Sequence, residues 1–218
     1  MDQYLSSGRF IDSDSPPVAA FARQAIAGAR GEAEQVLRLY GAVRDHVAYD
    51  PYINLADPAN YRASGVLAAK RGFCVGKAAL LAACCRAMGI PARTGYADVR
   101  NHMTSPKLYE RIKTDVFIWH SYAELFVAGR WVKATPAFDL ALCERVGIAP
   151  LAFDAQTDSL FHPFDRAGRR HMEYINDRGA FADVPFETML ADFRATYPAL
   201  IKDAGIAGDF RAEAVAAD

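Results

Sequence analysis

The sequence lacks several features that would assign it to a specialised class of protein. Its 25 Lys and Arg residues nearly balance 26 Asp and Glu residues, so it has no basic excess of the kind that nucleic-acid binders and membrane-surface proteins carry. No apolar run approaches the roughly 20 residues that span a bilayer. The first residues do not show a basic stretch followed by an apolar one, which is the pattern of a secretory signal. We therefore expect a cytoplasmic protein that binds neither nucleic acid nor membranes.

Cysteine is also scarce, with four in 218 residues. Cys84 and Cys85 are adjacent, which argues against a disulfide framework, so we expect reduced thiols. These two cysteines are predicted to lie in the middle of a helix, on its apolar face, and to pack in the core, whereas no role is predicted for Cys143. Three residues within a short stretch, His162, Asp165 and His171, match no zinc spacing, and no glycine-rich phosphate loop is present. The sequence thus predicts neither a metal nor a cofactor.

The sequence contains enough hydrophobic residues, 52% of the total, to form a hydrophobic core. The length is typical of one domain, which we predict over residues 1–218. Apolar spacing and capping signals predict helices over 18–29, 32–47, 64–70, 74–88, 140–146 and 186–202. Extended chain is predicted over 94–99, and a hairpin over 116–127 and 130–135. We expect an irregular stretch over 101–113, a loop-rich section before the last helix, and a frayed tail after Gly205. Helices followed by strands indicate an α+β fold.

Cys74 and His120 form the combination with the clearest chemical potential. Cys74 follows a glycine-containing turn and begins a predicted helix, where unpaired amides and the helix dipole favour the thiolate. Lys77, one turn later, is expected to add a positive charge on the same side. His120 lies in a predicted strand, which would hold a base rigidly beside a thiol nucleophile. Taken alone, each of Cys74 and His120 is more typical of a structural role.

Two sequence blocks resemble signatures of the transglutaminase-like superfamily. Gly72-Phe73-Cys74, followed by the run from Arg86 to Arg93 (RAMGIPAR), is similar to the cysteine helix and the "RAxGIPAR" signature of that family. The run from His120 to Glu124 (HSYAE), followed by Gly129-Arg130-Trp131, is similar to its "HxWxE…GxW" hairpin, with Tyr122 in place of the usual Trp. The resemblance covers about residues 35–140 and leaves 141–218 as a C-terminal extension. Arylamine N-acetyltransferases fit less well, because their "RGGxC" motif needs a second glycine.

The resemblance implies an α+β papain-like core, in which a cysteine-bearing helix packs on an antiparallel sheet. It implies that Cys74 is the nucleophile and His120 the base. It also implies an ion pair between Arg93 and Glu124 that links helix and sheet without doing chemistry.

The third catalytic residue is where the sequence departs from the family. Where the family commonly has Asp-Pro-Thr, this sequence has Thr135-Pro136-Ala137. A threonine hydroxyl can bond to an imidazole but cannot offset the charge of an imidazolium. We predict that Asp139, the nearest carboxylate, orients His120, with Thr135 as the alternative. Capping the helix that starts at Leu140 is a competing role for Asp139.

These residues predict a cysteine-dependent enzyme that acts on amide or acyl bonds through a thioester. Release by water would make it a peptidase or amidase, and release by an amine a transglutaminase-type acyltransferase. The substrate would be a peptide, a protein or a small amide. The alternative is a catalytically silent module that binds peptides or proteins. The segment 158–173 is predicted to cover one side of the cleft, and the sequence carries no signal of oligomeric state.

Overall fold

The computed structural model describes residues 1–102, 106–160 and 172–214. Its helices are α1 (Pro16–Ala25), α2 (Glu32–His46), α3 (Ala63–Ala69), α4 (Cys74–Ala87), α5 (Pro106–Ile112), α6 (Leu140–Arg145), α7 (Phe186–Thr196), α8 (Pro198–Lys202) and α9 (Phe210–Glu213). Its strands are β1 (Ala48–Tyr49), β2 (Arg71–Gly72), β3 (Ala92–Asn101), β4 (Val116–Val127), β5 (Arg130–Ala134) and β6 (Met172–Phe181). Two short 3-10 helices cover Asp2–Tyr4 and Pro58–Asn60.

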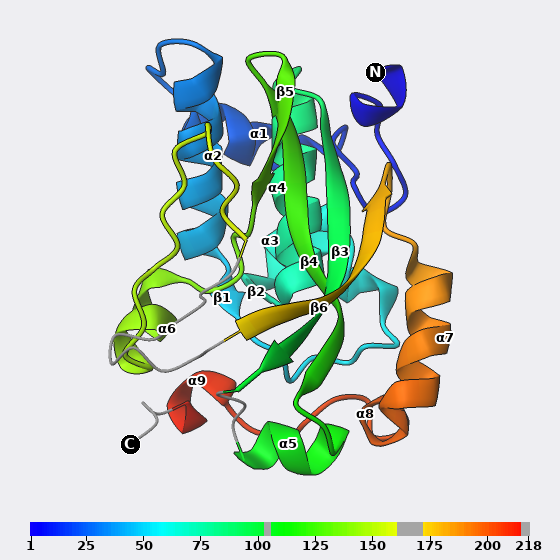
Figure 1. The fold of residues 1–218 in the computed structure, drawn as a ribbon. Coiled ribbons are helices and arrows are strands. Elements are labelled where there is room, and N and C mark those ends of the chain that lie inside the picture. The colour runs from blue at the N-terminus through cyan, green and yellow to red at the C-terminus, as the bar shows by residue number, and fades with distance from the viewer. Residues whose placement is uncertain (103–105, 161–171, 215–218) are drawn as a thin grey trace.

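The main sheet has four antiparallel strands in the order β5-β4-β3-β6, and α4 packs against one face of it (Figure 1). The predicted hairpin is confirmed, since β4 and β5 are joined by Ala128 and Gly129. These residues have φ angles of 49° and 83°, as a two-residue hairpin turn requires. The α+β class and the helix-on-sheet core are therefore confirmed.

Helix α4 occupies the centre of the molecule, with the sheet on one side and α1, α2 and α3 on the other (Figure 1). Its residues from Cys74 to Arg86 are buried on every side, as is typical of a central helix. Cys84 and Cys85 are completely buried, which agrees with their predicted packing role. All four cysteines carry free thiols.

Four elements differ from the sequence-based expectations. The stretch expected to be irregular contains α5, which begins at Pro106, a residue well suited to a first helical turn. The loop-rich section contains β6, a polar edge strand that forms by pairing with β3. The helix predicted over 186–202 breaks at Pro198, which lacks an N–H group. The stretch after Gly205, expected to fray, contains α9, and Arg145 of α6 donates to the carbonyls of Ala212 and Ala214.

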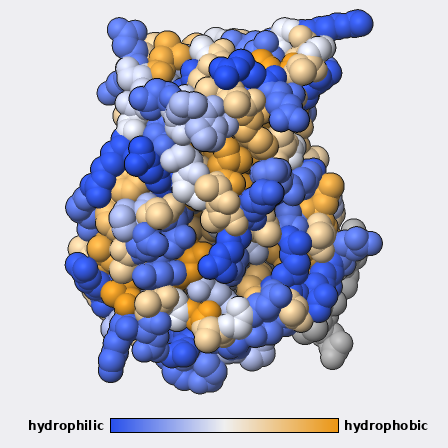
Figure 2. Space-filling model, turned by 180° about the vertical axis from the view of Figure 1, so that it is seen from behind, coloured by the Kyte–Doolittle hydropathy of each residue, from blue (hydrophilic) through white to orange (hydrophobic). Residues whose placement is uncertain are grey.

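The helical side of the molecule, opposite the sheet, has a mixed surface (Figure 2). Figure 2 shows hydrophobic side chains near its middle, interrupted and surrounded by hydrophilic ones. Among the described helices, none has the length and apolar character that a membrane crossing requires.

Candidate active site

Cys74 is the first residue of α4, and its thiol faces the strand that carries His120. The backbone N–H groups of Ser121, Val75 and Cys74 itself approach the sulfur atom. Ser121 directly follows His120 on β4, so helix and strand bring the two predicted catalytic residues to the same place. Cys74 and His120 line the same pocket, and both are largely buried.

The electrostatic environment of Cys74 differs from the expectation for a helix start. Burial raises the pKa of the Cys74 thiol to about 11, and the hydrogen bonds from the backbone amides of Ser121 and Val75 only partly oppose this rise. The thiol form is therefore favoured at neutral pH, and formation of the thiolate needs a base or a counter-charge.

Lys77 does not supply that charge as predicted. Its side chain is completely buried, and its ammonium donates to the carbonyl oxygens of Arg44, at 2.9 Å, and Val47. These carbonyls lie at the C-terminal end of α2, where a cation is favourable. Burial lowers the pKa of Lys77 to about 7. Lys77 therefore fastens α4 to α2.

A bulge in β4 lies immediately before His120. Ala97 pairs with His120 and Val99 with Phe117, so β4 contributes one residue more than β3 over this stretch. Trp119 absorbs the extra residue with a left-handed backbone, at a φ of 60°. Such a conformation costs about 1–2 kcal/mol for a non-glycine residue and often marks a functional site. The bulge sets the direction in which His120 leaves the strand.

A cluster of charged residues from three elements holds Trp119 in this conformation. The Trp119 N–H donates to Asp98 Oδ1 at 3.1 Å, and its indole Nε1–H donates to Asp192 Oδ2 at 2.8 Å. Arg178 joins the two carboxylates, with contacts of 2.5 Å to Asp98 and 2.8 Å to Asp192. Its guanidinium carbon lies 4.5 Å from the centre of the Trp119 ring. Sequence analysis missed this cluster, which we call the Trp119 clamp (Asp98, Arg178 and Asp192).

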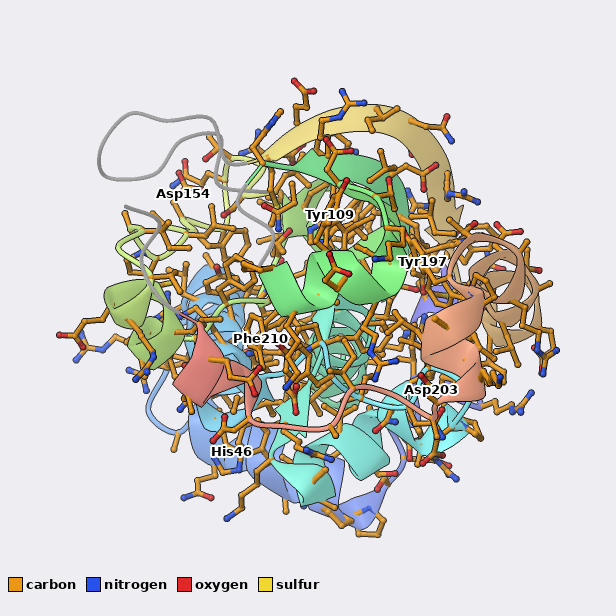
Figure 3. All side chains as sticks on the ribbon, turned by 90° about the horizontal axis from the view of Figure 1, so that it is seen from below. His46, Tyr109, Asp154, Tyr197, Asp203 and Phe210 are labelled. Carbon is orange, nitrogen blue, oxygen red and sulfur yellow. The ribbon has the colours of Figure 1, made fainter. Side chains whose placement is uncertain are left out.

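The pocket shared by Cys74 and His120 has a volume of about 480 Å³, and α5, α8 and α9 contribute to its lining. Figure 3 shows these helices in a view from below. There α5 and α9 lie side by side, joined by an ion pair of 2.7 Å between Lys107 and Glu213. Phe210 of α9 and Tyr197, which joins α7 to α8, both contribute to the lining. The size is within the range of small-molecule sites, about 300–1,000 Å³.

Sequence comparison identifies the family. The model of the transglutaminase-like superfamily matches residues 19–136, which is more than half of the chain. The protein belongs to the transglutaminase-like superfamily. No curated protein matches the sequence.

Similar solved structures include a proposed cysteine protease from Cytophaga hutchinsonii, with 20% identity and a TM-score of 0.48 over 83% of this chain and 46% of that chain. A proposed protease from Parabacteroides distasonis has 15% identity and a TM-score of 0.40 over 63% and 27% of the two chains. A TGase has 18% identity and a TM-score of 0.42 over 61% and 34%. The chain thus spans less than half the length of each of these structures.

The transglutaminase-like signature residues have clear structural roles here. Arg86 is buried and donates to three backbone carbonyls, those of Ala92, Ser6 and Ala182. The predicted ion pair between Arg93 and Glu124 is confirmed, at 2.6 Å. It joins facing residues of β3 and β4, and so links two strands where a link between helix and sheet was expected.

Asp139 is buried and caps α6, as the competing interpretation predicted. Its Oδ1 accepts from the N–H of Leu142 at 3.1 Å and from Arg211 at 2.6 Å. Its Oδ2 accepts from the N–H of Tyr49 at 2.9 Å. The alternative residue, Thr135, donates its hydroxyl to the carbonyl of Leu160 at 2.5 Å. The role of Asp139 in orienting His120 stays a prediction.

Most of the segment 158–173, predicted to cover one side of the cleft, lies outside the described residues, as do His162, Asp165 and His171. Within the described part of the chain, no group of three or more His, Cys, Asp or Glu side chains is placed to hold a metal ion.

Proposed function

We propose that this transglutaminase-like protein is an enzyme that cleaves amide or related acyl bonds through a thioester on Cys74. The observation that carries the proposal is the meeting of α4 and β4: the Cys74 thiol lies against the Ser121 amide, next to His120, at the wall of a pocket of about 480 Å³. A nucleophile at a helix start, a base on a rigid strand and space for a substrate are the parts that acyl transfer requires.

In the proposed mechanism, His120 accepts the proton of the Cys74 thiol, and the sulfur attacks the substrate carbonyl carbon. The N–H groups of Cys74 and Val75 at the start of α4 stabilise the oxyanion. The carbon–nitrogen bond breaks as His120 returns its proton to the leaving amine, which leaves a thioester. A water molecule then adds to the thioester, the carbon–sulfur bond breaks, and the thiol is restored.

The raised pKa of the thiol gives His120 its importance in this scheme. A buried thiol with a pKa near 11 is almost fully protonated at neutral pH, so transfer of its proton must accompany or precede the attack. Asp139 remains our prediction for the residue that orients His120. An Asp139→Asn variant distinguishes its roles, because asparagine still caps a helix but cannot offset an imidazolium.

A substrate screen tests the proposal. Wild-type protein is incubated with peptide and small-molecule amides, and release of ammonia or amine is followed with and without an added primary amine. The Cys74→Ala variant should be inactive, while Cys143→Ala, which removes another buried cysteine, should retain full activity. Equal turnover by wild type and Cys74→Ala would contradict the proposal.

The same screen decides between the two reactions. We propose hydrolysis as the principal one, so a carboxylic acid should form whether or not an amine is present. Incorporation of the added amine would instead identify an acyltransferase. A cytoplasmic location and a single domain over 1–218 remain predictions that accompany this proposal.

A catalytically silent binding module is the second candidate, and the raised pKa of Cys74 favours it. In that case wild type and Cys74→Ala would bind the same peptides or proteins with equal affinity, and neither would release amine from any amide.

A further inference from the structure

The pocket beside Cys74 has a chemical character that bears on the substrate. Behind the two catalytic candidates, its described walls consist mainly of aliphatic and aromatic side chains from β4, α5, α7 and α8, among them Leu108, Ile112, Ile118, Phe193 and Leu200. A peptide backbone placed against such walls would leave amide groups without hydrogen-bond partners, at a substantial energetic cost. An apolar group would instead gain from leaving water.

Two polar side chains of the described lining, those of Tyr197 and Glu213, are already bonded to the protein, and Asn101 and His102 add further polar atoms near the edge of the apolar walls. The Tyr197 hydroxyl accepts from the N–H of Ile118 at 2.8 Å and donates to the carbonyl of Val116 at 2.7 Å. The carboxylate of Glu213 pairs with Lys107 at 2.7 Å and accepts from the Tyr52 hydroxyl at 3.0 Å. Glu213 is the one acidic residue in the described lining, and Lys107 balances its negative charge.

The C-terminal segment closes one side of the pocket and is fixed in place. Phe210 packs edge-on against Tyr49 and Tyr52, with ring centres 5.9 and 5.3 Å apart. Arg211 pairs with the buried Asp139 at 2.6 Å. These contacts make the described C-terminal residues a fixed wall on one side of the pocket.

We propose that this pocket binds the acyl part of the substrate and that the acyl part is apolar: an unbranched or aryl carboxylic acid joined to its leaving group as an amide. The proposal rests on the function proposed above, because it places the carbonyl of this acyl group at Cys74. Each methylene group buried in the pocket should strengthen binding about fourfold until the pocket is full.

Binding to the Cys74→Ala variant tests this proposal without requiring catalysis. Titration calorimetry with butanamide, hexanamide and octanamide should show Kd falling about fourfold per methylene group. The monoamide of the eight-carbon dicarboxylic acid should bind at least tenfold more weakly than octanamide, because its terminal carboxylate would enter an apolar pocket. Absence of binding, or a Kd that does not change with chain length, would overturn the proposal.

A pair of substitutions, each made in the Cys74→Ala background, locates the binding site. Ile118→Asp places a charge in the pocket and should weaken octanamide binding at least tenfold. Ile175→Asp makes the same change on β6, where the isoleucine is 48% exposed and lies outside the pocket lining, and should leave Kd unchanged. Equal Kd values for the two variants would place the amide elsewhere and overturn the proposal. Thermal unfolding of both variants verifies that they are folded.

Turnover of the same amides by wild-type protein separates the two proposals. Chain-length-dependent binding without any release of ammonia would uphold the apolar pocket and count against the enzymatic function. Release of ammonia at rates that do not depend on chain length would uphold the function and overturn the apolar pocket.

Discussion

Removal of the Asp98 side chain should expose how much the bulge before His120 depends on the Trp119 clamp. In Asp98→Ala, the buried N–H of Trp119 loses its acceptor, which costs about 1–3 kcal/mol. Arg178 also loses one of its two carboxylate partners, and the strained backbone of Trp119 loses the hydrogen bond that stabilises it. We expect the free energy of unfolding to fall by about 3 kcal/mol, since the ion pair is mostly buried. For a chain of this size, this corresponds to a decrease in Tm of roughly 6–12 °C.

Urea denaturation and calorimetry measure this loss, with Asp115→Ala as the matched control. Asp115 pairs with Arg100 at 3.1 Å, but its side chain is 46% exposed, so its removal should cost about 0.5 kcal/mol or less. We also expect Asp98→Ala to slow alkylation of Cys74, because a relaxed Trp119 would turn His120 away. If the two variants lose the same stability, Asp98 does not hold the bulge and the reasoning is refuted.

Three further predictions follow from buried contacts. Lys77 has a pKa of about 7 in the folded chain and about 10.4 when unfolded, so its ionisation opposes folding fully below pH 7 and not at all above 10.4. The free energy of unfolding of wild type, measured by urea denaturation, should therefore rise by up to about 5 kcal/mol relative to that of Lys77→Met as the pH increases from 7 to 10.4. A difference between the two proteins that stays constant with pH would contradict this. Glu124→Ala should lower the free energy of unfolding by about 2–3 kcal/mol, because Arg93 loses its ion-pair partner. A decrease in Tm no larger than that of Asp115→Ala, which removes an exposed ion pair, would contradict this. Gly95→Ala should cost about 1–3 kcal/mol, because a Cβ atom would clash with the Tyr122 ring; an unchanged Tm would show that the ring moves aside.

Features that depend on neighbouring residues could be predicted from the sequence. Helix α4 begins at Cys74 as predicted, because the turn at Gly72 and the stop signals at Gly89 and Pro91 lie within the same short stretch. The hairpin at Ala128-Gly129 is set by two positive φ angles next to alternating strands.

The environment of the site depends on residues that are distant in sequence, so it could not be predicted. Asp98 and Arg178 meet because β6 pairs with β3, and β6 is too polar to be recognised as a strand. The raised pKa of Cys74 results from tertiary burial, which outweighs the local effect of a helix start. Phe210 reaches the pocket wall only because the C-terminal segment folds back.

The dependence of Cys74 alkylation on pH tests the pairing of Cys74 with His120 most directly. Iodoacetamide modification, followed by mass spectrometry of the peptide that carries Cys74, gives the pH at which the rate is half-maximal for wild type and His120→Ala. Burial alone would place the midpoint near pH 11 for both proteins. Because His120 accepts the thiol proton during the attack in our account, we predict appreciable labelling of wild type below pH 8 and loss of that labelling in His120→Ala. Identical profiles for the two proteins, with slow labelling of both at neutral pH, would contradict the account.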